Sequence, residues 1–167
     1  MVSNPVAVTV TEEPLPWEGN GSEESPYLIK SVSDLEALRE KVNKDGFTFS
    51  DAYFRLDADI TLPDGWKPIG STKNGKVNLE NGANLNAFSG ILDGAGHTIT
   101  VPEGGLPLFG YVRNTRIRNL NIYGKKIAGY GLINNFEGVG LSGSAVEIDN
   151  VTLKSGSSTL KSGLIGA

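Results

Sequence analysis

Apolar and polar positions follow the same order in two stretches of the chain, residues 117–122 and 148–153. The first stretch reads Ile-Arg-Asn-Leu-Asn-Ile and the second reads Ile-Asp-Asn-Val-Thr-Leu, with Asn at the third position of both. A Gly-Leu pair follows each copy, at 131–132 and 163–164, and another precedes the first copy at 105–106. Such a repeat predicts a solenoid, because one copy cannot bury its apolar face without a neighbouring copy stacked on it.

Short apolar-polar segments earlier in the chain are typical of β-strands. We expect strands over 53–56, 60–62, 88–92 and 97–101, separated by turns rich in Gly, Asn and Asp. Short strands without a helix in each repeat favour a parallel β-helix over a leucine-rich repeat, whose spacing pattern is absent. The predicted fold class is all-β, a single-stranded parallel β-helix.

Equivalent residues of successive coils should stack, because coils of a β-helix lie about 4.8 Å apart. The apolar residues of the first copy are expected to lie under those of the second. Asn119 should lie under Asn150 at a corner, where an amide side chain can bond along the stack and tolerate left-handed backbone angles. Gly94 and Gly96 are expected to form a turn between two strands.

One helix is predicted, over about 33–43. Ser33 and Glu36 fit a capping box at its start. An apolar stripe at helical spacing predicts one buried face, formed by Leu35, Leu38 and Val42. Gly46 is expected to close the helix.

The chain divides into two expected parts. Residues 1–24, which contain a short alternating Val segment and then Pro- and Gly-rich sequence, are interpreted as a leader or linker, and residues 25–167 as the β-helical unit. Within that unit, 71–86 and 137–145 are polar or Gly/Ser-rich and are interpreted as excursion loops.

Composition narrows the function classes. There are no cysteines, so neither a disulfide framework nor a thiolate metal site is expected. The formal charge is −4, with the basic excess confined to the second half of the chain and without interleaved aromatic residues, which disfavours nucleic acid as a partner. No apolar run is long enough to predict membrane insertion.

Few residues are candidates for chemistry. Asp57, Asp59 and Asp93 could form a carboxylate cluster for catalysis or calcium binding, but Asp also accepts backbone N–H groups at turns, which is the interpretation we favour. His97 is the only histidine and is expected to be structural. We therefore predict no catalytic residues, no metal site and no cofactor.

Two tryptophans are the candidates for ligand binding. Trp17 and Trp66 could stack on sugar rings if their faces were exposed. For Trp66, packing in or near the core is the favoured alternative.

An ordered series of segments resembles the bacterial surface β-helix proteins that carry GLUG-type repeats, including the lead-in regions of some immunoglobulin A peptidases and many adhesin-like proteins. These segments are 26–29, 34–38, 54–60, 66–70, 88–99, 108–112 and 117–120. The resemblance covers 26–167. It implies a right-handed β-helix whose first coil is covered by the N-terminal helix, on an exported surface protein. It supplies no catalytic site.

We therefore expect a non-enzymatic structural or adhesive module, extracellular or on the bacterial surface, with surface glycans or host proteins as partners. Two alternatives stay open: a fragment of a carbohydrate-binding or polysaccharide-degrading β-helix protein, and an accessory domain of a surface metallopeptidase. The segment 161–167 begins another coil and stops, so the remainder of a parent polypeptide is expected at that edge.

Overall fold

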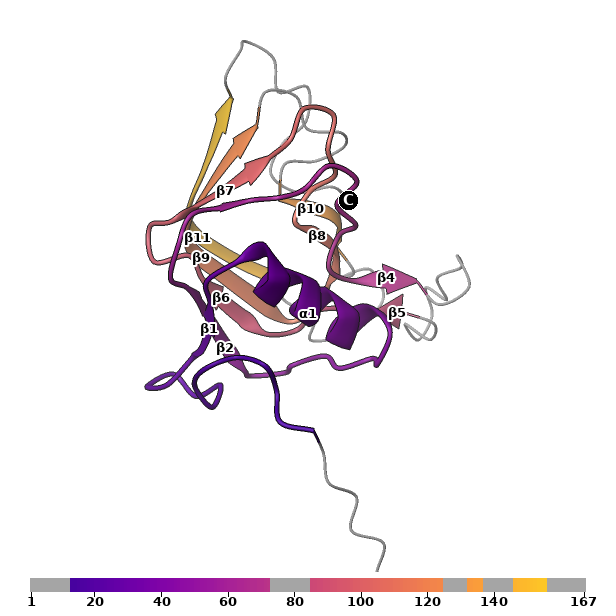
Figure 1. The fold of residues 1–167 in the computed structure, drawn as a ribbon, viewed down its shortest axis with the longest axis vertical. Helices are drawn as coiled ribbons and strands as arrows, with labels where there is room; N and C mark the ends of the chain where they lie inside the picture. The colour runs from indigo at the N-terminus through magenta and orange to yellow at the C-terminus, as the bar shows by residue number, and fades with distance from the viewer. Residues whose placement is uncertain (1–12, 73–84, 125–131, 137–145, 156–167) are drawn as a thin grey trace, which may run out of the picture.

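The computed structural model describes residues 13–72, 85–124, 132–136 and 146–155 (Figure 1). Strands dominate, and the described part contains one helix. The elements are β1 (Tyr27–Ile29), α1 (Val32–Asn43), β2 (Tyr53–Leu56), β3 (Ile60–Thr61), β4 (Ser71–Thr72), β5 (Leu85–Asn86), β6 (Ile91–Asp93), β7 (Thr98–Val101), β8 (Phe109–Val112), β9 (Thr115–Gly124), β10 (Ile133–Phe136) and β11 (Val146–Ser155).

The main sheet has seven strands, and all of its pairings are parallel. Its path runs β1-β2-β6-β9-β7-β3, and β11 pairs with β9. β6 pairs with the first part of β9 and β7 with the last part, so this long strand joins two stacks of shorter strands. A second parallel pair joins β8 to β10, and a bridge from Ile69 to Phe109 extends it.

Residues 71–86, expected to be an excursion loop, begin and end in an antiparallel pair, β4 with β5. Their middle, 73–84, lies outside the described residues, as do the expected loop at 137–145 and the C-terminal segment 156–167. The alternating Val segment near the N-terminus also lies outside them. The one helix in the described part of the chain is not long and apolar enough to cross a membrane.

The stacking predicted for the repeat is confirmed. β9 and β11 pair in parallel, with Ile117 opposite Ile148, Leu120 opposite Val151 and Ile122 opposite Leu153. Asn119 and Asn150 interrupt these strands at the same point, with left-handed φ angles of 53° and 49°. The Asn150 Nδ2 donates to Asn119 Oδ1 over 2.9 Å, which is the expected corner bond.

Inward-facing side chains form apolar rows that cross several strands. One row consists of Phe54, Leu92, Ile117 and Ile148, and another of Ile60, Ile99, Ile122 and Leu153. Members on β2, β3, β6, β7 and β9 are almost fully buried, whereas those on β11 are half-buried. Each fully buried side chain of this size stabilises the fold by about 1.5–3 kcal/mol, so the rows are a large part of what holds the strands in register.

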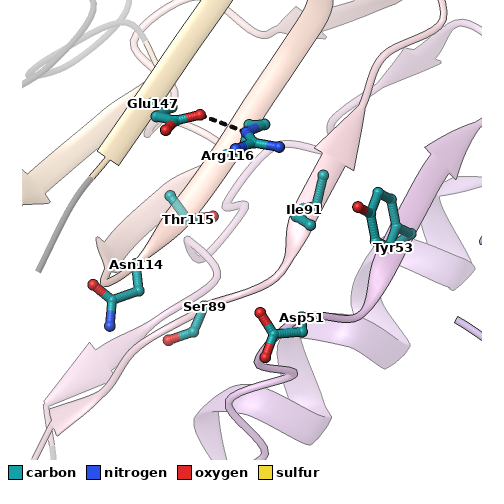
Figure 2. A pocket seen from close by; sticks show the side chains of 8 residues that line it. All are labelled: Asp51, Tyr53, Ser89, Ile91, Asn114, Thr115, Arg116 and Glu147. Atoms are coloured by element: carbon teal, nitrogen blue, oxygen red, sulfur yellow. Dashed lines mark hydrogen bonds and ion pairs between the residues drawn. The ribbon is translucent and has the colours of Figure 1, made fainter. Parts of the chain in front are cut away.

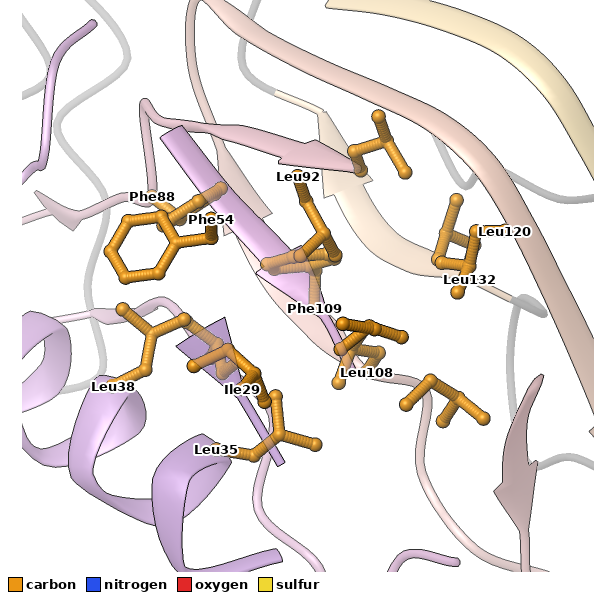
Figure 3. Close-up of a cluster of buried hydrophobic side chains, with 14 of the residues drawn as sticks. Ile29, Leu35, Leu38, Phe54, Phe88, Leu92, Leu108, Phe109, Leu120 and Leu132 are labelled. Atoms are coloured by element: carbon orange, nitrogen blue, oxygen red, sulfur yellow. The ribbon is translucent and has the colours of Figure 1, made fainter. Parts of the chain in front are cut away.

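The helix packs one face against this core. Leu35, Leu38 and Val42 are buried, as the spacing predicts. Figure 3 shows Leu35 and Leu38 beside Ile29, and these three residues and Val42 belong to one apolar cluster. Thus one side of the core is covered by a helix rather than by a strand.

The predicted capping box at Ser33 and Glu36 is wrong. The N-cap is Ser31, two residues earlier than predicted. Its Oγ accepts from the Asp34 N–H over 3.3 Å, and Asp34 Oδ2 accepts from the Lys30 N–H over 2.9 Å. Two Ser-x-x-acid patterns overlap here. Ser31 has the extended backbone that a cap requires, and it leaves Ser33 inside the first turn.

The described part of the expected leader, residues 13–24, belongs to the same packed unit as the sheet. Trp17 is 6% exposed and its Nε1 donates to the Asp34 carbonyl over 3.1 Å. The Tyr53 N–H donates to the Gly21 carbonyl over 2.9 Å, which extends the edge of β2. A boundary at residue 24 is therefore not visible in the packing.

The turn with Gly94 and Gly96 lies between β6 and β7, as expected. A Cβ on Gly94 would lie 2.5 Å from the Asn119 carbonyl oxygen, and Gly96 has a φ of 83°. Gly94 lets the turn approach β9 this closely because it lacks a side chain, whereas Gly96 suits the turn because glycine adopts a positive φ without strain.

Candidate functional site

The outward face of β2, β6, β9 and β11 carries two rows of side chains in register. The first row consists of Tyr53, Ile91, Arg116 and Glu147, and the second of Arg55, Asp93, Arg118 and Asp149. These residues alternate along each strand with the buried ones, so they point away from the core.

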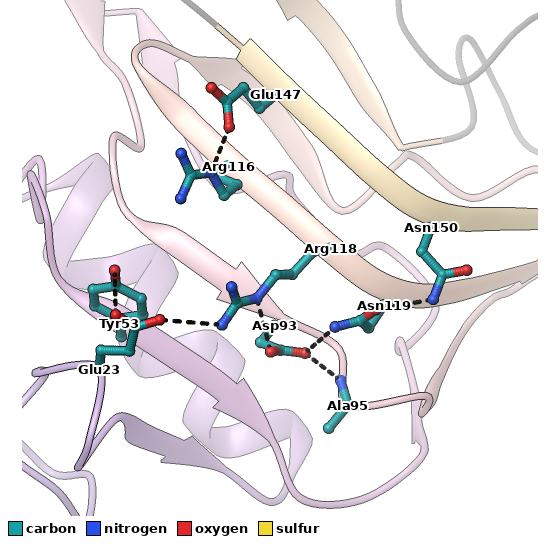
Figure 4. A network of polar contacts seen from close by, with 9 residues as sticks. All are labelled: Glu23, Tyr53, Asp93, Ala95, Arg116, Arg118, Asn119, Glu147 and Asn150. Carbon is teal, nitrogen blue, oxygen red and sulfur yellow. Dashed lines mark hydrogen bonds and ion pairs between the residues drawn. The ribbon is translucent and has the colours of Figure 1, made fainter.

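The second row alternates in charge from strand to strand. Arg118 lies between Asp93 and Asp149, and its Nε donates to Asp93 Oδ2 over 2.9 Å. Its guanidinium also lies 3.9 Å from Glu23, on the segment before β1 (Figure 4). Opposite charges on directly paired positions favour this register over a shifted one.

Asp93 is the centre of the polar network in Figure 4. Its Oδ1 accepts from the Ala95 N–H over 2.9 Å and from Asn119 Nδ2 over 3.2 Å. Burial by itself would raise the pKa of Asp93, but the hydrogen bonds from Ala95, Asn119 and Arg118 outweigh it and the pKa lies below its ordinary value. Asp93, Asn119 and Asn150 thus form a continuous side-chain ladder along the corner.

Asp59 has a similar role at another turn. Its Oδ1 accepts from the Thr98 N–H over 2.8 Å and lies 3.2 Å from His97 Nδ1. The Thr98 N–H, and after it His97, lower the pKa of Asp59. Asp59 and Asp93 therefore bind separate partners, and Asp57 is exposed. Within the described residues there is no group of three or more His, Cys, Asp or Glu able to hold a metal ion.

The two tryptophan candidates are in the core. This confirms the favoured interpretation of Trp66, and it corrects the stacking role considered for Trp17. Trp66 is 2% exposed, its Nε1 donates to the Pro107 carbonyl over 3.2 Å, and the Arg39 guanidinium lies 5.2 Å from its ring centroid. Trp17 packs against Tyr27 and Phe54 with centroid distances of 5.5 Å. Neither ring has a free face for a ligand.

A pocket of about 420 Å³ lies where the outward rows begin (Figure 2). It is lined by Asp51, Tyr53, Ser89, Ile91, Asn114, Thr115, Arg116 and Glu147. The whole first row therefore contributes to it. Thr115, the first residue of β9, and three loop residues just before the strands provide the rest.

Local bonds set the geometry of this pocket. Arg116 Nε donates to Glu147 Oε2 over 2.5 Å, and this hydrogen bond raises the pKa of Arg116. Thr115 is buried and its hydroxyl donates to the Gly90 carbonyl. Tyr53 was not among the candidate residues from the sequence. Its position next to the apolar Phe54 in a predicted strand could have placed it on the outer face. The loops that complete the pocket could not be predicted, because their sequences have no periodic pattern.

Comparisons with known proteins give two partial likenesses. The chain is 34% identical over 151 residues to Halomucin of Haloquadratum walsbyi, covering 85% of this chain and 2% of that protein. It is 31% identical over 123 residues to the "Putative Gly-rich membrane protein" of Evansella cellulosilytica, covering 65% of this chain and 12% of that protein. No protein-family model and no solved structure matches the chain. The chain thus corresponds to a small part of both relatives.

Proposed function

We propose that this chain is the N-terminal capped part of a right-handed parallel β-helix of the GLUG-repeat type, and that it serves as a non-enzymatic structural and adhesive module outside the cell. The observation that carries the proposal is the repeated order in which the chain visits three parallel stacks. The first stack consists of β1, β2, β6 and the first parts of β9 and β11, and the second consists of β3, β7 and the last parts of β9 and β11. The third consists of Ile69, β8 and β10. The chain visits the stacks in this order on each pass, from β2 to Ile69, from β6 to β8 and from β9 to β10, and begins again with β11.

This order supports a β-helix. The second and third passes each add a strand to all three stacks, whereas the first pass reaches the third stack only through the bridge at Ile69, and the described part of the last pass reaches the first two stacks through β11. All the described pairings within the stacks are parallel, and the apolar rows run through successive passes. Differences in length between passes fall at corners: Asp93 to His97 form a whole turn where the next two passes each use one left-handed Asn.

The N-terminal elements are suited to cap such a solenoid. The stack begins with β1, and both α1 and Trp17 place apolar side chains in the core beside this first strand. The charged side chains of the helix form ion pairs: Arg39, which also covers Trp66, pairs with Glu40 over 3.5 Å, and Lys41 pairs with Asp45 over 3.1 Å. A helix that is apolar toward the core and charged elsewhere can cover the end of a solenoid and so protect it from pairing with other strands.

Two further observations support a structural rather than a catalytic role. The carboxylates of Asp59 and Asp93 are engaged in turn and ladder hydrogen bonds. The likeness to small parts of two much longer proteins, one of them named a membrane protein, supports a module within a long surface polypeptide.

Intact-cell labelling tests the location. An antibody raised against the folded chain should label unpermeabilised source cells, and external protease should remove the signal. Labelling that needs permeabilised cells would contradict an extracellular role.

A turnover screen tests the absence of enzymatic activity. Neutral and acidic polysaccharides incubated with the purified chain should release no new reducing ends or unsaturated products. Release that is abolished by Asp59→Asn or Asp93→Asn would overturn the structural proposal in favour of polysaccharide degradation.

A further inference from the structure

We infer that the pocket at the start of β2, β6, β9 and β11 binds a neutral oligosaccharide that runs across the strands. This inference rests on the proposed adhesive function and names the ligand class of its site. It is argued from the spacing, the chemistry and the charge of the residues that line the pocket.

The floor of the pocket has a repeat that suits an extended glycan. Tyr53, Ile91, Arg116 and Glu147 come from four adjacent parallel strands, in direct register. Neighbouring strands lie about 4.8 Å apart. This spacing is close to the advance per unit of an extended pyranose chain, so successive sugars can meet successive side chains of the row.

One end of this floor is apolar. Tyr53 and Ile91 are adjacent and both half-buried, and Figure 2 shows their side chains side by side at the pocket. The Tyr53 hydroxyl donates to Glu23 Oε2 over 3.3 Å, which orients the ring. An aromatic ring held in this way offers area to the apolar face of a pyranose.

Polar groups line one edge of the pocket. Asp51, Ser89 and Asn114 follow one another along the edge where the strands begin, with Asp51 nearest Tyr53 and Asn114 beside Thr115. Within the described part of the chain, the Asp51 carboxylate forms no hydrogen bond or ion pair. A carboxylate at the rim of a concave site can accept hydrogen bonds from two neighbouring sugar hydroxyls. Ligand sites commonly combine an apolar floor with a few polar groups that orient the ligand.

The charges favour a neutral ligand over an anionic one. The lining contains two carboxylates, Asp51 and Glu147, and one guanidinium, Arg116. Arg116 is already paired with Glu147. An oligosaccharide of uronic acids or a sulfated glycan would therefore meet an unpaired carboxylate and no free cation among these residues.

The rim is held in a defined shape. Asp51 and Asn114 have left-handed φ angles of 61° and 46°, and Phe49, next to this turn, has a φ of 56°. The Ala52 N–H donates to the Phe49 carbonyl over 3.0 Å, which closes the turn that carries Asp51. Backbone held in these regions by its surroundings reduces the ordering required when a ligand binds.

Titration calorimetry with defined oligosaccharides tests the inference. We expect neutral β-1,4-linked gluco- or xylo-oligosaccharides, from tetramer to hexamer, to bind at least tenfold more tightly than oligogalacturonates of the same length. Tyr53→Ala should weaken this binding about tenfold, which is the size of effect expected for one aromatic contact. Tyr123→Ala, at a ring that is 39% exposed on β9 and outside the pocket, is the matched control and should change it less than twofold.

Two conservative variants keep the test valid if Tyr53→Ala does not fold. Tyr53→Phe retains the ring and should keep most of the affinity. Asp51→Asn tolerates the left-handed backbone and should weaken binding, because it removes the carboxylate. Tighter binding of oligogalacturonate, equal effects of Tyr53→Ala and Tyr123→Ala, or no binding of any oligosaccharide would overturn the inference. None of these outcomes would contradict the proposal of a structural module outside the cell. That proposal is contradicted instead by enzymatic turnover of a polysaccharide or by labelling that needs permeabilised cells.

Discussion

At the scale of single residues, the corner ladder shows why particular side chains are needed. Asn119 and Asn150 occupy the left-handed region, which costs most residues about 1–2 kcal/mol but suits Asn. Their amides also bond along the stack, from Asn150 to Asn119 and from Asn119 to Asp93. One residue type therefore meets both a backbone and a hydrogen-bonding requirement.

The two requirements can be separated by substitution at Asn119. Asn119→Ala loses the bonds and also strains the backbone, so we expect it to lower the free energy of unfolding by about 2–3 kcal/mol. Asn119→Gly keeps the left-handed angle and should cost about 1 kcal/mol. Urea unfolding of the two variants measures the difference, and equal losses would show that the angle does not matter here.

Asp93 should make the stability depend on pH. Because its hydrogen bonds hold its pKa below the ordinary value, the ionised form contributes stability that is fully present above the pKa of an unfolded Asp, about 3.9, and is lost as the pH falls through the lower folded-state pKa. Asp93→Asn should be less stable than wild type at neutral pH and should lose less stability on acidification. Unfolding curves of the two proteins that fall in parallel from about pH 5 to pH 2 would contradict this.

At the scale of elements, the sequence predicted what repeats and missed what depends on contacts distant in the chain. The Ile-x-Asn-Leu phrase led to the register of β9 and β11, and the Leu35, Leu38, Val42 spacing to the buried face of α1. The burial of Trp17 was not predictable because its partners, Tyr27 and Phe54, come from two later strands. The charged row on the outer face was missed for the same reason: its members alternate only across strands.

The start of α1 offers a paired test of the corrected cap. Ser31→Ala removes the acceptor for the Asp34 N–H and should cost about 1 kcal/mol of unfolding free energy. Ser33→Ala, inside the first turn, should change stability by less than about 0.5 kcal/mol because Ala favours a helix. Thermal or urea unfolding measures both losses. A larger loss for Ser33→Ala than for Ser31→Ala would show that Ser33 is the N-cap.

At the scale of the whole molecule, the account depends on how the passes of the chain stack. α1 and Trp17 pack beside the first strand, β9 is paired on both sides, and β11 carries the last pairing described. The half-burial of Ile148 and Leu153, compared with full burial of their partners on β9, follows from this order. A proposed β-helix grows in this way, since each pass completes the core of the one before.

The most direct test uses cysteine pairs, because the chain has no cysteine of its own. Asn121 and Thr152 are partners across β9 and β11, whereas Lys154 lies two residues farther along β11. Oxidation should join the double variant Asn121→Cys with Thr152→Cys in the folded protein, and should fail for Asn121→Cys with Lys154→Cys, because a disulfide needs Cα atoms within about 7 Å. Equal cross-linking of both pairs, or of the shifted pair alone, would contradict the stacked register on which the proposed β-helix rests.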